Sequence, residues 1–183
     1  MKRLYKFLNG NKSKNGGTVW KVGEWKRANG KLKMCKNGFH ASCYIQDALR
    51  YVPGLHLALV EVRGKHLKDD DKECWREMRV IKKWKWGKRE SVKLAVISAR
   101  DCLKNYEDKF PGDSRPRVAV EAAEAWLRQP TRSAESAARS AESAAWSAAE
   151  SVAWSAAWSA AESAAKRRIH TEILRQLKKG ASG

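Results

Sequence analysis

The sequence predicts an α+β protein: a small basic domain with a mixed or antiparallel sheet, followed by a long helix rich in Ala, Ser and Trp. Three observations predict it. Short apolar or alternating runs, typical of strands, dominate up to residue 86, and helical periodicity dominates after that point. From residue 133 the chain becomes a repeat of one large residue followed by small ones. Strands that precede helices, rather than alternate with them, are typical of α+β folds.

The first strands are predicted over residues 3–8, 18–25 and, as a short segment, 32–35. Side chains alternate between the two faces of a strand. Leu4, Lys6 and Leu8 therefore share one face of the first strand, and Tyr5 and Phe7 share the other. Turns rich in Asn and Gly separate these segments.

The most apolar run, residues 55–62, predicts a strand in the centre of the sheet. Residues 63–72 are charged and are expected to form a loop. Residues 73–86 predict a last strand, in which Met78, Val80, Trp84 and Trp86 are in phase. Charged residues occupy the other register, so one face of this strand is expected to be basic and solvated.

Helical patterns cover residues 45–51, 91–103 and 117–128, and Pro and Gly around residues 111–116 indicate a linker. Residues 131–179 contain neither Gly nor Pro, and Ala is the best helix former, so we expect one long helix there. The predicted organisation is a basic domain over 1–112, a linker with a short helix over 113–130, and an association helix over 131–179.

The repeat in that helix carries its large residues at steps of mostly four, and three of them are Trp146, Trp154 and Trp158. Each Trp can bury about 150–250 Å², so something must cover these rings. Four glutamates interrupt the repeat and exclude a membrane span. We expect homo-oligomerisation through this helix; packing on the protein's own domain and docking of a foreign partner are the alternatives.

The formal net charge is +18, and it is concentrated in the first domain. Residues 1–112 hold 27 Lys and Arg against 12 Asp and Glu, a difference of +15, whereas residues 113–183 hold 11 against 8, a difference of +3. A charge of this sign favours nucleic acid or nucleotide partners. Solubility alone is the alternative explanation.

The four cysteines do not follow a common zinc-binding spacing, and we predict no metal and no cofactor. The basic Met1-Lys2-Arg3 start is not followed by the apolar stretch of a secretory signal. The cysteines are therefore expected to be reduced thiols in a cytoplasmic protein.

Basic residues alternate with Trp at the end of the last predicted strand, at Lys82, Lys83, Trp84 and Lys85. Lysines beside exposed aromatic rings are suited to single-stranded nucleic acid, because they offer charge for phosphates and a π-face for bases. The alternation also allows the opposite arrangement, in which the Trp rings enter the core and the lysines face water.

Two motifs carry a resemblance: Tyr5-Lys6 on the first strand, and Asn37-Gly38-Phe39-His40-Ala41 after a turn. With the helix over residues 47–51 and a strand that ends in Glu61-Val62, they resemble an uncharacterised domain family common in phages and prophages. The resemblance covers about residues 1–100 and implies a protein that acts in the cytoplasm of a bacterial host.

The same order of motifs resembles, more distantly, the core of small ADP-ribosyltransferases. That resemblance implies a nucleotide pocket in which Lys6 stands where the family usually holds the adenosine side of NAD. His40 and Ser42 would lie near the nicotinamide, and Glu61 is the implied catalytic acid, with Asp69 to Asp71 as substitutes. Phe7-Leu8 stands in place of the family's glycine.

We therefore predict a phage-type, non-enzymatic binding protein that captures an anionic partner, either a nucleic acid or a nucleotide-type signal, and interferes with host machinery such as defence. The partner could also be a nucleic-acid-containing host complex. The alternative is an ADP-ribosyltransferase-like enzyme that uses NAD. The predicted ligand-binding residues are Tyr5, Lys6, His40, Ser42, Glu61, Lys82, Lys83, Trp84 and Lys85.

Overall fold

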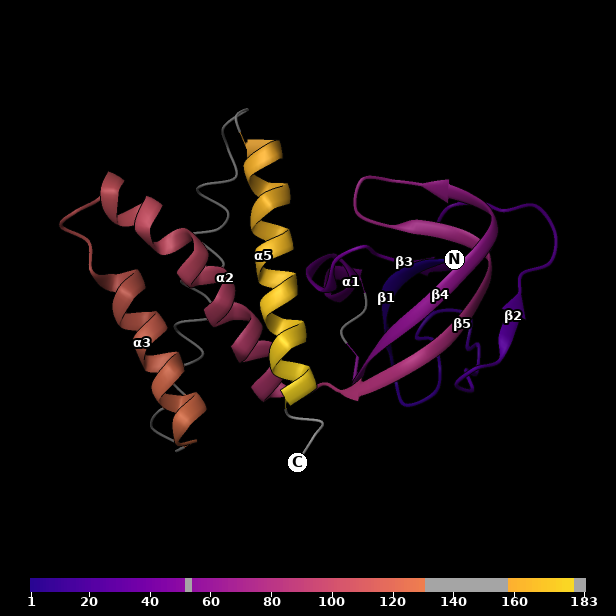
Figure 1. Cartoon of the computed structure of the whole chain (residues 1–183), viewed down its shortest axis with the longest axis horizontal. Coiled ribbons are helices and arrows are strands. Elements are labelled where there is room, and N and C mark those ends of the chain that lie inside the picture. Colours follow the sequence, from indigo (N-terminus) through magenta and orange to yellow (C-terminus); the bar gives the residue numbers. More distant parts are fainter. Residues whose placement is uncertain (52–53, 131–157, 180–183) are drawn as a thin grey trace. The chain divides into compact units, whose positions relative to one another are not determined.

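The structure, a computed structural model, describes residues 1–51, 54–130 and 158–179. The chain divides into two compact units, residues 1–87 and 88–183. The first unit contains all the described strands, and the described part of the second is helical (Figure 1). The α+β class predicted from the sequence is confirmed.

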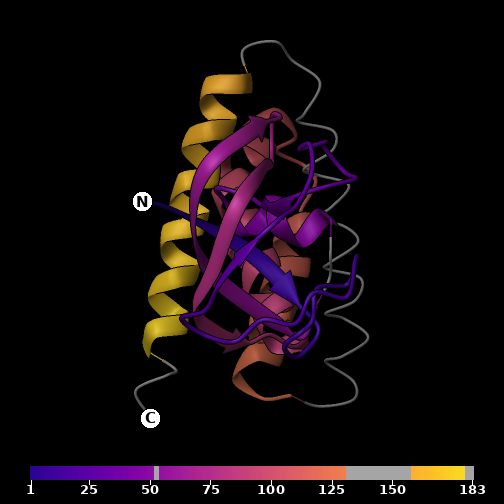
Figure 2. The ribbon, with the colours of Figure 1, turned by 90° about the vertical axis from the view of Figure 1, so that its right-hand side faces the viewer.

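The sheet of the first unit is built around a long antiparallel pair, β4 (His56–Lys68) and β5 (Glu73–Lys85). Strand β1 (Lys2–Leu8) pairs with the free side of β4, and β2 (Trp25–Arg27) pairs with the free side of β5. The two long strands run side by side and twist together in both views of the ribbon (Figures 1 and 2). The apolar strand is thus central, as its uncharged sequence predicts.

A short strand, β3 (Phe39–Ala41), joins the two sides of this sheet. It pairs with the start of β5, while the next residue, Ser42, exchanges two backbone hydrogen bonds with Tyr5 on β1, at 2.8 and 2.9 Å. The hydrogen-bonded circuit β1–β4–β5–β3 therefore closes on itself. Closure removes free strand edges and encloses a core.

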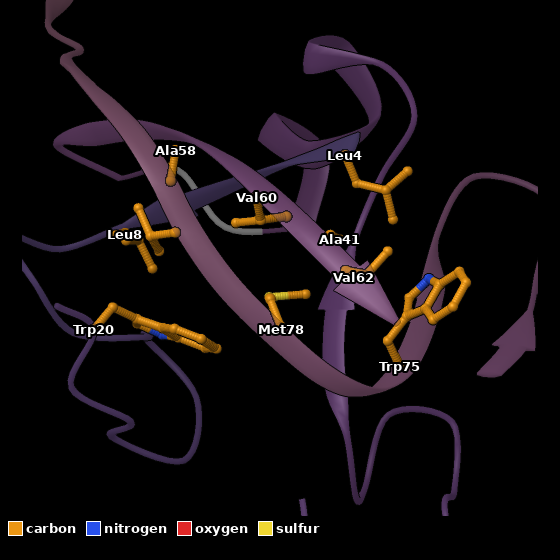
Figure 3. Packing of buried hydrophobic residues seen from close by; sticks show 10 residues of the cluster. Leu4, Leu8, Trp20, Ala41, Ala58, Val60, Val62, Trp75 and Met78 are labelled. Atoms are coloured by element: carbon orange, nitrogen blue, oxygen red, sulfur yellow. The ribbon is translucent and has the colours of Figure 1, made fainter. Parts of the chain in front are cut away.

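The core lies on the inner face of this circuit, where apolar side chains from the strands converge with Trp20 from the long first loop (Figure 3). Residues that oppose each other across an antiparallel pair share a face. Leu4 opposes Val60, and Val60 opposes Val80, so one row of the core crosses three strands. All three residues are buried.

A β-bulge changes the face of the last part of β5. Val60 pairs with Val80, but Leu59 pairs with Lys82, so Ile81 is an extra residue in the strand. A bulge of one residue exchanges the two faces beyond it. Met78 and Trp84, expected in phase from the sequence, therefore lie on opposite faces, and Trp84 is buried against the side that holds Leu57.

The remaining helix of the first unit is α1 (Ile45–Tyr51), which packs on β1 through Ile45 and Ala48. The second unit holds α2 (Lys88–Lys109), α3 (Arg115–Arg128) and α5 (Trp158–Lys179). Helices α2 and α3 share an apolar cluster centred on Val96 and Trp126. Ile169 and Ile173 of α5 are buried, and Arg168 donates two hydrogen bonds to Asp101 of α2, at 2.8 and 2.7 Å.

Three expected elements differ in the structure. Residues 18–24 and 32–35 form loops with isolated bridges, and the strand expected over 18–25 is present only from Trp25, where β2 begins. Trp20 is buried in the core, and residues 33–37 close a tight turn. The charged segment 63–72 is mostly strand, since β4 continues to Lys68 with its polar side chains exposed. The sequence predicts that the first domain ends at residue 112, after α2. The chain instead divides after residue 87, so α2 belongs to the second unit.

Candidate functional site: a lysine-lined cavity

A cavity of about 390 Å³ opens in the first unit. It is formed by β1, β3, the end of α1, and two loops that contain residues 13–18 and 35–38. Four of the ligand-binding residues predicted from the sequence lie in its lining: Tyr5, Lys6, His40 and Ser42. The pairing of Tyr5 with Ser42 brings them together, although 37 residues separate the two in the chain.

The Asn37-Gly38 pair shapes one wall of the cavity. The side-chain amide of Asn37 donates to the carbonyl oxygens of Asn29 and Lys31, at 2.6 and 2.9 Å, and so fixes the preceding loop. Gly38 has φ 126°, and a Cβ there would lie 2.4 Å from the Sγ of Cys74. Only glycine fits this position, because both the conformation and the space exclude a side chain.

The next two residues of the motif have separate roles. Phe39 packs edge-on against Trp20, with ring centroids 5.0 Å apart, and so joins β3 to the core. The Nε2 atom of His40 accepts a hydrogen bond from the backbone N–H of Cys35 at 3.0 Å. Cys35 has φ 60°, which is uncommon for a residue with a side chain. The hydrogen bond to His40 helps to hold this strained turn against the cavity.

The imidazole of His40 is held neutral by its surroundings. Burial lowers its pKa, and the nearby positive charges of Lys6 and Lys72 lower it further. A neutral ring with Nε2 as acceptor is consistent with the hydrogen bond from Cys35. His40 thus contributes a polar aromatic surface to the cavity rather than a positive charge.

Lys6 is a half-buried cation of the cavity. Its side chain lies on the inner face of β1, opposite the buried Ala58, and its Nζ donates to the backbone carbonyl oxygen of His40 at 3.1 Å. Burial lowers the pKa of Lys6 to about 8. No carboxylate in the described part of the chain pairs with this ammonium group.

The charge of the lining has one sign. Among the described residues, no Asp or Glu lines the cavity, whereas four cations do: Lys6, Lys14, Lys36 and Lys72. We name it the lysine cavity after these four residues. Lys14 lies in the basic loop that ends in Gly16-Gly17, and the fold of this loop brings it into the lining.

Lys72 belongs to a polar group at the rim. Its ammonium lies 4.1 Å from the ring centroid of Tyr51 and 3.5 Å from a carboxylate oxygen of Asp69. The hydroxyl of Tyr51 donates to Asp71. Tyr51 and Lys72 line the cavity, and the two carboxylates behind them hold the rim in place. Neither Tyr51 nor Lys72 was predicted as a site residue from the sequence.

Glu61 lies elsewhere. It opposes Arg3 on β1 and Arg79 on β5, on the outer face of the sheet, and it is absent from the lining of the lysine cavity. Its carboxylate accepts hydrogen bonds from Arg79 at 2.8 and 2.5 Å and from Arg3 at 3.3 Å. Hydrogen bonds from Arg79 lower the pKa of Glu61. The structure therefore does not place this carboxylate where the transferase resemblance implies a catalytic acid.

The basic end of β5 is also separate from the lysine cavity. Lys82 and Lys85 are exposed, and Lys83 donates to the side chain of Asn11. Trp84 is only 8% exposed, so its ring offers little surface on which a base could stack. This arrangement is the second of the two that the alternation allows.

The predicted association helix is described only from Trp158 onward, where α5 begins. Trp146 and Trp154 fall outside the described residues. The part that is described contacts α2, where Arg168 donates to Asp101, and it buries Ile169 and Ile173. Homo-oligomerisation through the repeat stays a prediction.

The described residues contain no cluster of His, Cys, Asp and Glu that could hold a metal ion. Within the same residues, no helix is long and apolar enough to cross a membrane.

Residues 2–91 match the model of a family described as Domain of unknown function (DUF7666). The match includes every strand of the sheet and all residues of the lysine cavity. No curated protein and no solved structure matches the chain.

Proposed function

We propose that this protein is a non-enzymatic binding protein that captures a small phosphorylated ligand of the nucleotide type in the lysine cavity. The observation that carries the proposal is the charge of the lining, with four lysines and no carboxylate among the described residues. Unbalanced positive charge in a concave site attracts anions and concentrates them there.

The size and composition of the lysine cavity support a small ligand. Its volume, about 390 Å³, lies at the lower end of the range of about 300–1,000 Å³ that is usual for small-molecule sites. The lining combines lysines with Tyr5, Phe39 and Tyr51, whose rings can contact a base or another flat group. Lysine ammonium groups bind phosphate oxygens as point charges.

Two observations make the other candidates less suitable. Binding of nucleic acid along β5 would use Trp84 for stacking, but that ring is buried. Transfer of ADP-ribose would use Glu61, but that carboxylate is bound by Arg3 and Arg79 on the outer face. Neither arrangement lies at the lysine cavity.

The test compares two double variants that each remove two exposed positive charges from the first unit. Lys14→Ala with Lys36→Ala changes the lysine cavity, and Lys82→Ala with Lys85→Ala changes the basic end of β5. Isothermal titration calorimetry measures binding of AMP, a cyclic dinucleotide, NAD and a single-stranded oligonucleotide to each variant. Circular dichroism controls for folding.

We expect the first double variant to lose at least about tenfold in affinity for one of the nucleotides, which corresponds to about 1.4 kcal/mol, and the second to retain it. Equal losses in both variants would indicate non-specific attraction by the net charge. A steep salt dependence seen only with the oligonucleotide, and removed by the β5 variant, would favour nucleic-acid binding instead. Turnover of NAD that Glu61→Gln abolishes would replace the proposal by the transferase.

The biological setting is part of the proposal. The resemblance of Tyr5-Lys6 and of the segment 37–41 to a phage domain family supports a phage protein that acts in the cytoplasm of its bacterial host. There, removal of a nucleotide signal would interfere with host defence. Mass spectrometry of small molecules that co-purify from infected cells identifies the ligand.

A further inference from the structure

Lys6 differs from the other lysines of the first unit in what surrounds its ammonium group. Several of those lysines are paired with a carboxylate: Lys2 with Glu73, Lys26 with Glu24, and Lys72 with Asp69. The Nζ of Lys6 has one described acceptor, the carbonyl oxygen of His40 at 3.1 Å. An ammonium group with one neutral acceptor is poorly compensated for its loss of water.

The position of Lys6 on β1 explains this. Its neighbours on the inner face are Leu4 and Leu8, both fully buried, and it opposes Ala58, which is also fully buried. The small side chain of Ala58 leaves room for the lysine stem, which crosses an apolar strip before its nitrogen reaches the lysine cavity. Lys6 is thus held in the interior of the sheet with its amine at a ligand-accessible surface.

We propose that Lys6 is a reactive amine and that the lysine cavity captures ligands that carry an aldehyde or ketone group by forming an imine with Lys6 Nζ. This goes beyond the proposed function, because non-covalent retention of a nucleotide requires no reaction. Burial lowers the pKa of Lys6 to about 8 and so raises the fraction of neutral amine at physiological pH. Lysines desolvated in this way are the ones that form Schiff bases.

The reaction needs no oxidant, reductant or metal. The lone pair of the neutral amine attacks the carbonyl carbon, a C–N bond forms, and the π electrons move to the carbonyl oxygen, which takes up a proton while the nitrogen releases one. The carbinolamine then expels that oxygen as water together with the second amine proton, and a C=N bond remains. Amine and carbonyl compound thus give imine and one water.

The surrounding cations define the class of ligand. Lys14, Lys36 and Lys72 line the same cavity, so a phosphate or carboxylate on the ligand can be held by them while its carbonyl group meets Lys6. A carbonyl compound without a negative charge lacks this second contact. The structure therefore favours anionic aldehydes and ketones over neutral ones.

The experiment uses two probes on the full chain. Acetylacetone, a 1,3-diketone, forms a stable conjugated enaminone with a neutral lysine, which near-ultraviolet absorbance detects. Pyridoxal 5′-phosphate followed by borohydride tests an anionic aldehyde, and pyridoxal is its matched control without phosphate. Mass spectrometry of peptides locates each adduct. Lys6→Arg keeps the charge but removes the amine, and Lys65→Arg changes an exposed lysine outside the lysine cavity.

We expect one enaminone per chain, at Lys6, formed at pH 7 on the order of a hundredfold faster than at exposed lysines, because a pKa of about 8 in place of about 10.4 raises the neutral fraction by that order. The rate should rise with pH and level off above about 8. Lys6→Arg should lose the adduct and Lys65→Arg should keep it. Pyridoxal 5′-phosphate should label Lys6 faster than pyridoxal does.

Labelling spread evenly over the exposed lysines, or retained at the same rate in Lys6→Arg, would overturn the proposal. If Lys6→Arg does not fold, the peptide map of the wild-type chain decides the question alone. The outcome is separable from the proposed function: nucleotide binding that persists while Lys6 stays unlabelled rejects only the imine. Labelling of Lys6 by acetylacetone in a chain that binds no nucleotide rejects only the nucleotide.

Discussion

The two faces of the sheet in the first unit are both rich in cations, but they differ in how many of these cations are paired with carboxylates. On the outer face, arginines and glutamates alternate across the strands in a cross-strand arginine–glutamate ladder made of Arg3, Arg27, Glu61, Arg63, Glu77 and Arg79. Glu77 accepts from Arg27 at 2.9 Å and from Arg63 at 2.6 Å. On the inner side, the lysine cavity has no carboxylate in its described lining.

The charges on the outer face pair with one another and so support the fold, whereas most lysines of the cavity have no carboxylate beside them in the described part of the chain. In the ladder each glutamate lies between two arginines, and Trp25 packs against the guanidinium groups of Arg63 and Arg79, at 4.1 and 4.9 Å. Opposite charges across strands stabilise a sheet. In the described lining of the lysine cavity only Lys72 is paired with a carboxylate, that of Asp69, so a bound anion would stabilise the positive charges of the other three lysines.

The largest effect should come from a methyl group placed at the wall of the lysine cavity. We expect Gly38→Ala to lower the free energy of unfolding by about 3–5 kcal/mol, because its Cβ would lie 2.4 Å from Cys74 Sγ and 2.9 Å from Leu32 Cδ2. The matched control is Gly64→Ala on β4. Its φ is also positive, at 82°, but its nearest contact is an ordinary 3.4 Å, so we expect a loss of about 1–2 kcal/mol.

Urea unfolding of both variants measures the difference. Equal losses would show that the backbone conformation alone, and not the close approach of Cys74, requires glycine at position 38.

The second prediction concerns the cost of the buried cation. The pKa of Lys6 falls from 10.5 to about 8 on folding. Between these values the unfolded chain holds a proton that the folded protein has released, so stability rises with pH across this window. Lys6→Met should remove this rise and increase stability at pH 7 by at most about 3 kcal/mol, offset by the lost hydrogen bond to His40.

The measurement is the difference in urea unfolding free energy between Lys6→Met and the wild type at pH 7 and pH 10. A difference that does not change with pH would show that Lys6 keeps an ordinary pKa in the folded protein. The anion ligand should reduce the difference, because a phosphate near Lys6 favours its charged form.

The smallest effect at neutral pH should follow from Glu61→Gln in the ladder, since glutamine still accepts hydrogen bonds from Arg79. The pKa of Glu61 is lowered by these hydrogen bonds, so its contribution to stability is present above pH 4.5 and is lost as the pH falls below that value. In the variant, the free energy of unfolding should therefore depend less on pH below 4.5. Nucleotide binding should not change, and a loss of binding would place Glu61 at the site after all.

The four cavity residues predicted from the sequence came from two short motifs, Tyr5-Lys6 and the segment 37–41 with Ser42 directly after it. Each motif can be recognised from its neighbours in the chain. Lys6 lies in a strand with alternating side chains, and Gly38 permits a tight turn. The remaining cations, Lys14, Lys36 and Lys72, come from three loops that approach each other only in the folded chain. Loop positions have no periodicity, so nothing in the sequence assigned these lysines to one site.

Glu61 and Trp84 are the opposite case: both were predicted to bind the ligand, and the structure places both outside the lysine cavity. Glu61 was predicted from its order along the chain in the transferase resemblance, and Trp84 from the lysines beside it. The register of β1, β4 and β5 puts Glu61 on the outer face. The bulge at Ile81 turns Trp84 to the face opposite Val80, where it is buried. A single extra residue in a strand leaves little trace in the pattern of side chains.

Alternation and composition by themselves determined the α+β class, the central apolar strand, helix α1 at residues 45–51, and the basic character of the first domain, because these depend on neighbours in the chain. Only the tertiary structure decided that β3 closes the sheet through Tyr5 and Ser42, and which positive charges are neutralised by the protein. Charges are balanced or left unbalanced by residues distant in sequence, and folding alone brings those residues together.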